Sequence, residues 1–274
     1  MTTPDPAAYW NGEGGKRWAD GHAHMDATLA VFGTALLRAA APQPGERCVD
    51  IGCGTGATTL ELARRTGAQV VGVDVSQLLV ELARTKLTVL SQPEVEFVVA
   101  DAATFPFEPV HDVVFSRFGV MFFPDPVAAF TNIRRALAPD GRLTFGCWRS
   151  IADNAWAAGP LAAARPLLPE VAPPDPHAPG PFAFADDARV RDLLTRAGWR
   201  DIGFERFDAT MDLGATVAEA TAETLRIGPL ARAAAELPAD VRAAIAGRVA
   251  DALASFEAGG RVAPPASIWL VTAR

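Results

Sequence analysis

The feature that most constrains this chain is a short apolar run that ends in three alternating glycines. Within residues 47–56, Val49 and Ile51 are β-branched, as a buried strand prefers. Gly52, Gly54 and Gly56 follow, and because they lack a Cβ atom a ligand can lie directly on the main chain. A helical pattern begins at Ala57, so free backbone N–H groups are expected at a helix N-terminus beside the loop. The segment predicts a nucleotide-type cradle.

The remaining apolar pattern predicts an α/β fold with a doubly wound, mostly parallel sheet. Strand-like and helix-like segments alternate, and repeated βα units of this length indicate a parallel sheet with helices on both faces. The expected strands are residues 69–74, 95–101, 112–116, 142–148 (after a turn at 139–141), 199–209 and 268–271. The expected helices are residues 29–40, 57–66, 76–90, 125–137, 154–168, 187–197 and most of 215–258. The last two strands, separated by a helical insertion, predict an antiparallel edge pair.

Changes in composition divide the chain into four expected segments. Prolines cluster between residues 166 and 181 and mark an irregular connection after the main βα repeats. The expected segments are an N-terminal flap and helix (1–44), a nucleotide-binding core (45–150), a cap with a Pro-rich insertion (151–185), and the rest of the sheet with a helical insertion at 215–258 (186–274).

The N-terminal flap mixes glycines with large aromatic side chains. Residues 1–26 include Trp10, Trp18, His22 and His24 together with three glycines before position 16. This mixture suggests a mobile segment that closes over something apolar. An ordinary flap that packs on the surface is the alternative.

Composition limits the partners of the chain. The 274 residues are 50% hydrophobic and carry a net charge of −7, which argues against a nucleic-acid or anionic-membrane surface. The longest apolar run, 27–41, is too short to span a bilayer, and the N-terminus has no secretion-signal pattern. Cys48, Cys53 and Cys147 lack metal-ligand spacing and suit reduced thiols. We therefore expect a cytoplasmic protein with a small-molecule substrate, no metal, no nucleic-acid partner and no membrane span; a homodimer is compatible with this.

Three acidic residues end three successive predicted strands. Asp50, Asp74 and Asp101 are expected at the carboxyl edge of the sheet, where open α/β folds bind their ligands. Asp74 lies 74 − 52 = 22 residues after Gly52, close to the offset of about 20 that places a carboxylate on ribose hydroxyls. Each acid alone is more often a cap or a solvated strand end, but the three together favour an adenosine-type ligand.

Two cofactors fit this pattern, a nicotinamide dinucleotide and an adenosyl sulfonium. Gly52, Gly54 and Ala57 satisfy the dinucleotide spacing. However, a pyrophosphate beside Asp50 would be repelled, whereas a sulfonium with its ammonium group would be attracted. The chain also has a single tyrosine, Tyr9, ahead of the sheet, which excludes a Tyr-x-x-x-Lys hydride-transfer pair. The sulfonium interpretation is therefore favoured.

These motifs together resemble class I S-adenosylmethionine-dependent methyltransferases. The resemblance rests on residues 47–56, Asp74, Asp101, residues 112–117 and residues 139–143. The run 116–123, followed by Asp-Pro, is similar to the small-molecule branch typified by the ubiquinone/menaquinone methyltransferases. The resemblance as a whole covers about residues 45–150 and implies a Rossmann-like sheet of seven strands whose last strand is antiparallel. The long segment after Trp148 departs from the simple family pattern, so the substrate is not carried over.

The resemblance also implies roles for individual residues. Asp50 would lie near the ammonium group, Asp74 would hold the ribose, and Asp101 with the Ala102 backbone would read the adenine. The residues expected to bind the cofactor are Asp50, Gly52, Cys53, Gly54, Gly56, Asp74, Val75, Asp101, Ala102, Ser116, Arg117 and Phe118. Of these, Ser116 and Arg117 would lie at the methionine end and Phe118 near the transferred methyl group.

Methyl transfer needs little acid–base machinery, because most of the acceleration comes from alignment in a dry pocket. The candidate catalytic residues are His22, His24 and Arg117; a solvated surface histidine is the alternative for the first two, and Asp26 is a weaker candidate base. The candidate substrate-binding residues are the aromatic side chains Trp10, Trp18, Phe122, Trp148 and Trp156, some of which could instead belong to the core. They suggest an apolar or aromatic acceptor, such as a natural product or a quinone-like ring.

Two other functions remain as alternatives. A cofactor-binding protein of the same fold would bind S-adenosylmethionine without methyl transfer. An NAD(P)-dependent oxidoreductase would bind a nicotinamide instead, and it is the less favoured of the two.

Overall fold

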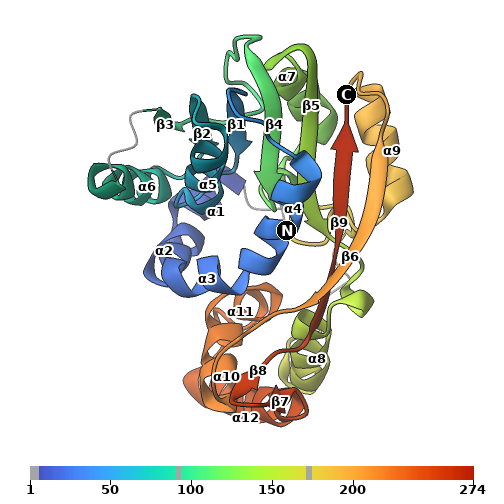
Figure 1. The fold of residues 1–274 in the computed structure, drawn as a ribbon. Helices are drawn as coiled ribbons and strands as arrows, with labels where there is room; N and C mark the ends of the chain where they lie inside the picture. The colour runs from blue at the N-terminus through green and yellow to red at the C-terminus, as the bar shows by residue number, and fades with distance from the viewer. Residues whose placement is uncertain (1–5, 91–93, 171–174) are drawn as a thin grey trace. The chain divides into compact units, whose positions relative to one another are not determined.

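The protein is built on a seven-stranded sheet with strand order β3-β2-β1-β4-β5-β9-β6 (Figure 1). The computed structural model describes residues 6–90, 94–170 and 175–274. The strands of this sheet are β1 (Cys48–Ile51), β2 (Val70–Asp74), β3 (Val95–Val99), β4 (His111–Arg117), β5 (Leu137–Trp148), β6 (Gly203–Thr210) and β9 (Pro265–Ala273). Strands β1 to β5 pair in parallel, and β9 runs antiparallel to β5. The predicted fold class, including the antiparallel last strand, is confirmed.

The chain divides into two compact units, which are described separately. Unit 1 comprises residues 1–148, 177–207 and 268–274, and unit 2 comprises residues 149–176 and 208–267. The division differs in detail from the four expected segments, whose boundaries stay a prediction.

Unit 1 contains the parallel strands and the helices that pack on them. These helices are α1 (Pro6–Asn11), α2 (Glu13–Asp20), α3 (His22–Thr28), α4 (Ala30–Ala40), α5 (Ala57–Thr66), α6 (Gln77–Leu90), α7 (Pro126–Arg134) and α9 (Asp187–Arg196). Phe115, Phe145 and Ile133 are fully buried in its core. Helix α4 lies close on β5 because Gly146 has no side chain; a Cβ there would come within 2.7 Å of Leu36. In Figure 1, α1 to α3 gather near the carboxyl ends of β1, β2 and β4.

Unit 2 is mainly helical. It contains α8 (Ala155–Ala164), α10 (Val217–Arg226), α11 (Pro229–Ala233) and α12 (Ala239–Ala254), together with a short hairpin of β7 (Glu257–Ala258) and β8 (Arg261–Val262). Asn154 is fully buried and joins the two chain segments of this unit, since its amide accepts a hydrogen bond from Ser267 N at 2.9 Å and donates one to Ser267 O at 3.1 Å. In the described part of the chain, no helix has both the length and the apolar character that a bilayer span requires.

The structure corrects several predicted elements. Strand β6 begins at Gly203 rather than 199, because Trp199 is drawn back onto α7 by a hydrogen bond from its indole N–H to Phe130 O. Strand β5 already begins at Leu137, and the expected turn at 139–141 lies within it as an irregularity next to β4. The β7–β8 hairpin was not predicted. The N-terminal flap consists of helices from residue 6 onward.

Candidate active site

The three glycines of the loop after β1 are required for three different reasons. All have positive φ angles, of +67° at Gly52, +55° at Gly54 and +82° at Gly56. A Cβ at Gly52 would lie 2.7 Å from Gly119 Cα, and one at Gly56 would lie 2.5 Å from the Phe97 ring. A Cβ at Gly54 would meet a single atom within 4 Å, at 3.9 Å. Gly54 is therefore the glycine whose face is open to a ligand.

Asp50 is fully buried at the end of β1. Its Oδ2 atom accepts hydrogen bonds from the hydroxyls of Thr58 (2.7 Å) and Thr59 (2.8 Å) in the first turn of α5. Burial raises the pKa of Asp50 to about 6, although both threonine hydrogen bonds and the charge of Arg117 act in the opposite direction. Among the described residues, Oδ1 has no partner. A cationic group such as the ammonium of S-adenosylmethionine would satisfy this oxygen, so the site fits that cofactor.

Asp74, at the end of β2, closes the glycine loop from the other side. Its Oδ2 accepts from Gly54 N and its Oδ1 from Ser76 N, both at 2.8 Å. Burial raises the pKa of Asp74, and these backbone hydrogen bonds partly offset that effect. Each carboxylate oxygen can accept a second hydrogen bond, so the residue can still hold ribose hydroxyls. Cys53 is buried, and its backbone N–H donates to Val73 O at 3.2 Å.

The segment after β3 lies next to this acid. Ala100 N donates to Asp74 O at 2.9 Å, which brings the following residues toward the expected ribose. Asp101 is exposed and accepts a hydrogen bond from Ala103 N (2.8 Å), while Ala102 is buried and its carbonyl accepts from Asn132 Nδ2 (3.0 Å). Asp101 and Ala102 therefore lie in the segment next to Asp74, and their assignment to the adenine stays a prediction.

The end of β4 is fastened to the end of β1. The Ser116 hydroxyl donates to Ile51 O at 2.7 Å and accepts from Gly119 N at 3.2 Å, so it supports the close approach of Gly119 to Gly52. This hydroxyl is fully buried. The structure thus gives Ser116 a positioning role that sequence reasoning missed.

Phe118 is the strained residue of the site. Its φ is +65°, which non-glycine residues rarely adopt and which often marks functional positions. Its ring stacks on Trp148 with centroids 4.4 Å apart and an interplanar angle of 3°, and the Phe32 ring packs edge-on against both. All three are at or near full burial. Trp148 therefore supports Phe118 from within the aromatic core.

Arg117 does not point freely into the site. Its Nη2 atom lies 3.1 Å from Asp26 Oδ1 in α3. Asp26 Oδ2 is also 3.4 Å from Lys86 Nζ and accepts a hydrogen bond from the Thr55 hydroxyl at 3.3 Å. Lys86 in turn donates to the Thr55 carbonyl at 2.9 Å. We call Asp26, Arg117, Lys86 and Thr55 the Asp26 cluster; it ties the N-terminal helices to the glycine loop.

Sequence reasoning missed most of these contacts. Asp26 was considered only as a weak candidate base, and nothing in the local pattern marked Lys86, since one lysine in an amphipathic helix is usually a solvated side chain. Thr58 and Thr59 carry a weak signal, because they lie in the first helical turn after the glycine loop. Gly119 carries a similar signal as a second glycine near a predicted strand end.

Three of the predicted aromatic residues form one cluster. The Trp10 ring packs edge-on against Trp18 and Phe122, with centroid distances of 5.8 and 5.3 Å. The Trp18 indole nitrogen is the atom that faces Gly54. The cluster therefore lies beside the open part of the glycine loop.

The other candidates are placed differently. His22 Nδ1 is 2.8 Å from Ala19 O, whereas His24 Nε2 is buried and has no hydrogen-bond partner in the described residues. Trp156 belongs to unit 2, where its indole N–H donates to Asn154 Oδ1 at 3.0 Å. Val75 lies beside Asp74, and its carbonyl accepts from Asn11 Nδ2 at 2.9 Å.

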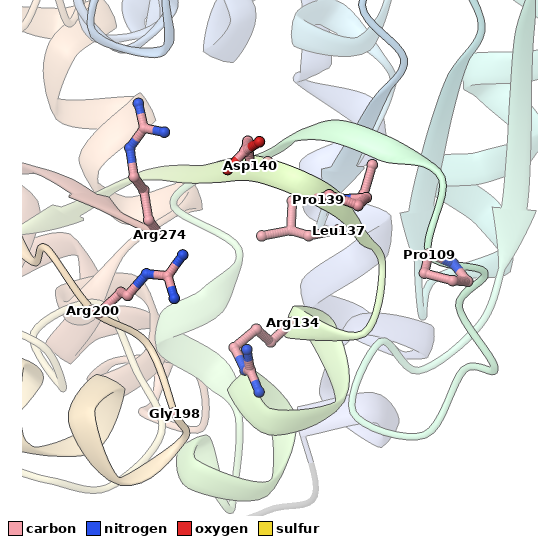
Figure 2. Close-up of a pocket in the computed structure, with 10 residues that line it drawn as sticks. Pro109, Arg134, Leu137, Pro139, Asp140, Gly198, Arg200 and Arg274 are labelled. Atoms are coloured by element: carbon pink, nitrogen blue, oxygen red, sulfur yellow. The ribbon is translucent and has the colours of Figure 1, made fainter.

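A separate cavity of about 460 Å³ in unit 1 has no part in this cradle (Figure 2). It is lined by residues that precede β4, begin β5 and follow the antiparallel strand β9, so it lies at the opposite edge of the sheet. The side chains of Arg134, Arg200 and Arg274 border it, and all three are exposed. None of the candidate site residues lines this cavity.

Comparison with known proteins identifies the family. Residues 49–145 match a family described as "Methyltransferase domain". A nocamycin O-methyltransferase of Saccharothrix syringae is 30% identical over 251 residues, which cover 87% of this chain and 89% of the relative. A demethylmenaquinone methyltransferase of Corynebacterium kroppenstedtii is 29% identical over 172 residues, covering 60% and 72%.

The fold agrees with this result. Phosphoethanolamine N-methyltransferase 2 of Haemonchus contortus, solved in complex with S-adenosyl-L-methionine, superimposes with a TM-score of 0.54 at 19% identity, covering 88% of this chain and 52% of that chain. The comparisons do not favour a cofactor-binding protein without methyl transfer or a nicotinamide oxidoreductase. The chain belongs to the class I S-adenosylmethionine-dependent methyltransferases, and S-adenosylmethionine is its cofactor.

Proposed function

We propose that this methyltransferase acts on a small apolar or aromatic acceptor, such as a natural product or a quinone-like ring. The observation that carries the proposal is the aromatic cluster of Trp10, Trp18 and Phe122 beside the open face of Gly54. Pockets for apolar ligands are typically lined by such side chains. The names of two relatives, a nocamycin O-methyltransferase and a demethylmenaquinone methyltransferase, support an acceptor of this class.

The residues of the cradle would mainly bind and orient. When bound, S-adenosylmethionine supplies a methyl group on a positively charged sulfur, which the acceptor attacks in line. Asp50 would hold the ammonium through its unpaired oxygen, and Asp74 would accept hydrogen bonds from the ribose. Phe118, supported by Trp148, would help to exclude water near the reacting atoms.

His24 is the stronger candidate for removing a proton from an acceptor. Its Nε2 atom is buried without a partner among the described residues, whereas His22 already uses its Nδ1 atom on Ala19 O. Arg117 has one guanidinium nitrogen on Asp26 and would use its other N–H groups to orient an acceptor carbonyl or carboxylate.

The test is the release of S-adenosylhomocysteine, measured by mass spectrometry, when the protein is given S-adenosylmethionine and a panel of acceptors. We expect turnover with phenols, quinols or polyketides. Turnover only with short polar amines would contradict the proposed acceptor class. Tight cofactor binding without turnover on any acceptor would instead support a binding protein.

Once an acceptor is found, His24→Asn is expected to lower kcat by about 10²-fold if His24 is the base, because general-base catalysis contributes on that order. His22→Asn is the matched control on the same helix and is expected to have a much smaller effect. An equal fall of kcat in both variants would contradict the assignment of His24 as the base.

We also propose that the protein works in the cytoplasm without a nucleic-acid partner; a homodimer is the oligomeric state to be tested. The three cysteines are buried and free, and the net charge of −7 opposes binding to nucleic acid. Light scattering of the purified protein tests the dimer, and a monomer at micromolar concentration would contradict it.

A further inference from the structure

A hydrogen-bond donor with no acceptor among the described residues lies beside the open face of Gly54. The Trp18 indole nitrogen lies 3.9 Å from the position of a Cβ on Gly54, and among the described residues no other atom outside residues 53–55 comes within 4 Å of that position. In the part of the chain that the structure describes, the Trp18 N–H makes no hydrogen bond, although the side chain is half-buried. An indole N–H can only donate, so this one is available to an oxygen of a ligand that lies on the glycine loop.

Several contacts hold Trp18 at this place. Helix α1 packs tightly on α2, because Gly15 would place a Cβ 1.9 Å from Trp10 O if it had one. The Trp10 carbonyl accepts a hydrogen bond from the Ser76 hydroxyl at 2.8 Å, directly after the strand that carries Asp74. On the other side of Trp18, the Asp26 cluster fastens α3 to the glycine loop. The indole is thus fixed from both ends of α2.

The oxygen that accepts this hydrogen bond must lie beside Gly54, on the part of the glycine loop where the cofactor is expected. Gly54 N donates to Asp74, so the ligand that Asp74 holds passes next to Gly54. The oxygens that S-adenosylmethionine brings to such a place belong to its ribose and to its carboxylate.

We propose that Trp18 also binds the cofactor, by donating its indole N–H to an oxygen of the ribose or of the carboxylate of S-adenosylmethionine. The N-terminal helices then complete the cofactor site, in addition to covering it. This inference rests on the proposed function only in that it uses the same site, and it requires cofactor binding without requiring turnover.

The test is calorimetric titration of wild type and of Trp18→Phe with S-adenosylhomocysteine. Phenylalanine keeps an aromatic ring in the cluster and removes the N–H, so we expect a Kd that is about five- to tenfold higher, the size of one lost hydrogen bond. The matched control is Trp199→Phe at the opposite edge of the sheet, which also loses an indole N–H, the donor to Phe130 O. The control is expected to unfold at a lower temperature but to bind with the wild-type Kd.

An unchanged Kd in Trp18→Phe, with the wild type binding normally, would overturn the inference and leave the proposed function intact. An equal rise of the Kd in Trp199→Phe would also overturn it, since the effect would then be one of general stability. Absence of S-adenosylhomocysteine binding in the wild type would instead contradict the cofactor itself. Thermal unfolding of free Trp18→Phe at the wild-type temperature establishes that the variant is folded.

A second titration identifies the oxygen. 5′-Methylthioadenosine keeps the ribose and lacks the carboxylate. A loss of affinity that persists with this ligand assigns the Trp18 N–H to the ribose, and a loss confined to S-adenosylhomocysteine assigns it to the carboxylate. Both results support the inference.

Discussion

Asp50 shows how burial alone changes the chemistry of one residue. Its carboxylate is removed from water and holds two threonine hydroxyls, yet one of its oxygens stays without a partner in the described residues. A buried charge of this kind costs stability unless a ligand compensates it. Such strain is expected at a position that is kept for cofactor binding rather than for folding.

Replacing Asp50 with Asn is therefore expected to stabilise the free protein at alkaline pH. Burial raises the pKa of Asp50 to about 6, against about 4 in the unfolded chain. Between these values the folded state holds more protons than the unfolded state, so wild-type stability falls as the pH rises. The free energy of unfolding of Asp50→Asn should exceed that of wild type by about 1–3 kcal/mol at pH 8 and by almost nothing at pH 4.

Urea denaturation of both proteins at the two pH values measures this difference. The same variant should bind S-adenosylhomocysteine more weakly at pH 8. A variant that is less stable than wild type at pH 8 would show that the Asp50 charge is compensated in the free protein.

At the scale of elements, the site depends on two loops that touch backbone to backbone. The loop after β1 and the loop after β4 meet at Gly52 and Gly119, and Ser116 joins them through hydrogen bonds to Ile51 O and Gly119 N. There is no room for a methyl group at this contact. The loop geometry therefore depends on β1 and β4 being neighbours in the sheet.

Gly119→Ala is expected to lower the free energy of unfolding by about 2–4 kcal/mol and to abolish tight cofactor binding. The new Cβ would lie 2.7 Å from Ile51 O and 2.8 Å from Gly52 Cα, which forces the two loops apart. Gly247→Ala in α12 is the control, because a Cβ there meets nothing within 4 Å; it should gain about 0.5–1 kcal/mol from helix propensity alone. Denaturant unfolding checks both, and a Gly119→Ala protein of wild-type stability would contradict the contact.

Helix α3 should loosen when the Asp26 cluster is broken. Asp26→Asn removes the charge that faces Arg117 and Lys86, whose side chains are only 11% and 28% exposed. We expect the local stability of α3 to fall by about 1–2 kcal/mol. Limited proteolysis should then cleave the first 40 residues faster than in wild type. Asp192→Asn, which breaks a solvent-exposed pair with Arg196, should leave the cleavage rate unchanged. Equal rates in all three proteins would show that the cluster does not hold the helix.

At the scale of the whole molecule, the residues predicted to bind the cofactor all belong to unit 1, whereas Trp156 belongs to unit 2. A ligand that binds only the native cradle stabilises the protein by mass action, by about 2.7 kcal/mol at a ligand concentration of 100 times the Kd. S-adenosylhomocysteine should therefore raise the temperature at which unit 1 unfolds.

Differential scanning calorimetry with S-adenosylhomocysteine, and separately with NAD and NADP, tests this. The homocysteine derivative is expected to raise the unfolding temperature and the nicotinamides to leave it unchanged. A shift with a nicotinamide alone would contradict the assigned cofactor.

The sequence by itself determined the sheet and the glycine loop with the two acids beside it. Alternating glycines after a strand leave few conformations for the main chain, and acids that end successive parallel strands must meet at one edge. The positions of Gly54, Asp50 and Asp74 at the ends of their strands could therefore be predicted before any coordinates, since strand periodicity and turn chemistry are local properties.

Only the tertiary structure decided which residues complete the site. The Asp26 cluster joins residues that are 29 to 91 positions apart in the sequence. Trp18 contacts Gly54 from helix α2, whose position on the sheet cannot be read from the strand pattern. Such contacts depend on how helices pack across the end of the sheet, and local propensity does not encode that packing. The same reason explains why sequence reasoning missed the hydrogen bond by which Ser116 joins β4 to β1. It also explains why Trp156, a predicted substrate-binding residue, lies in a different unit.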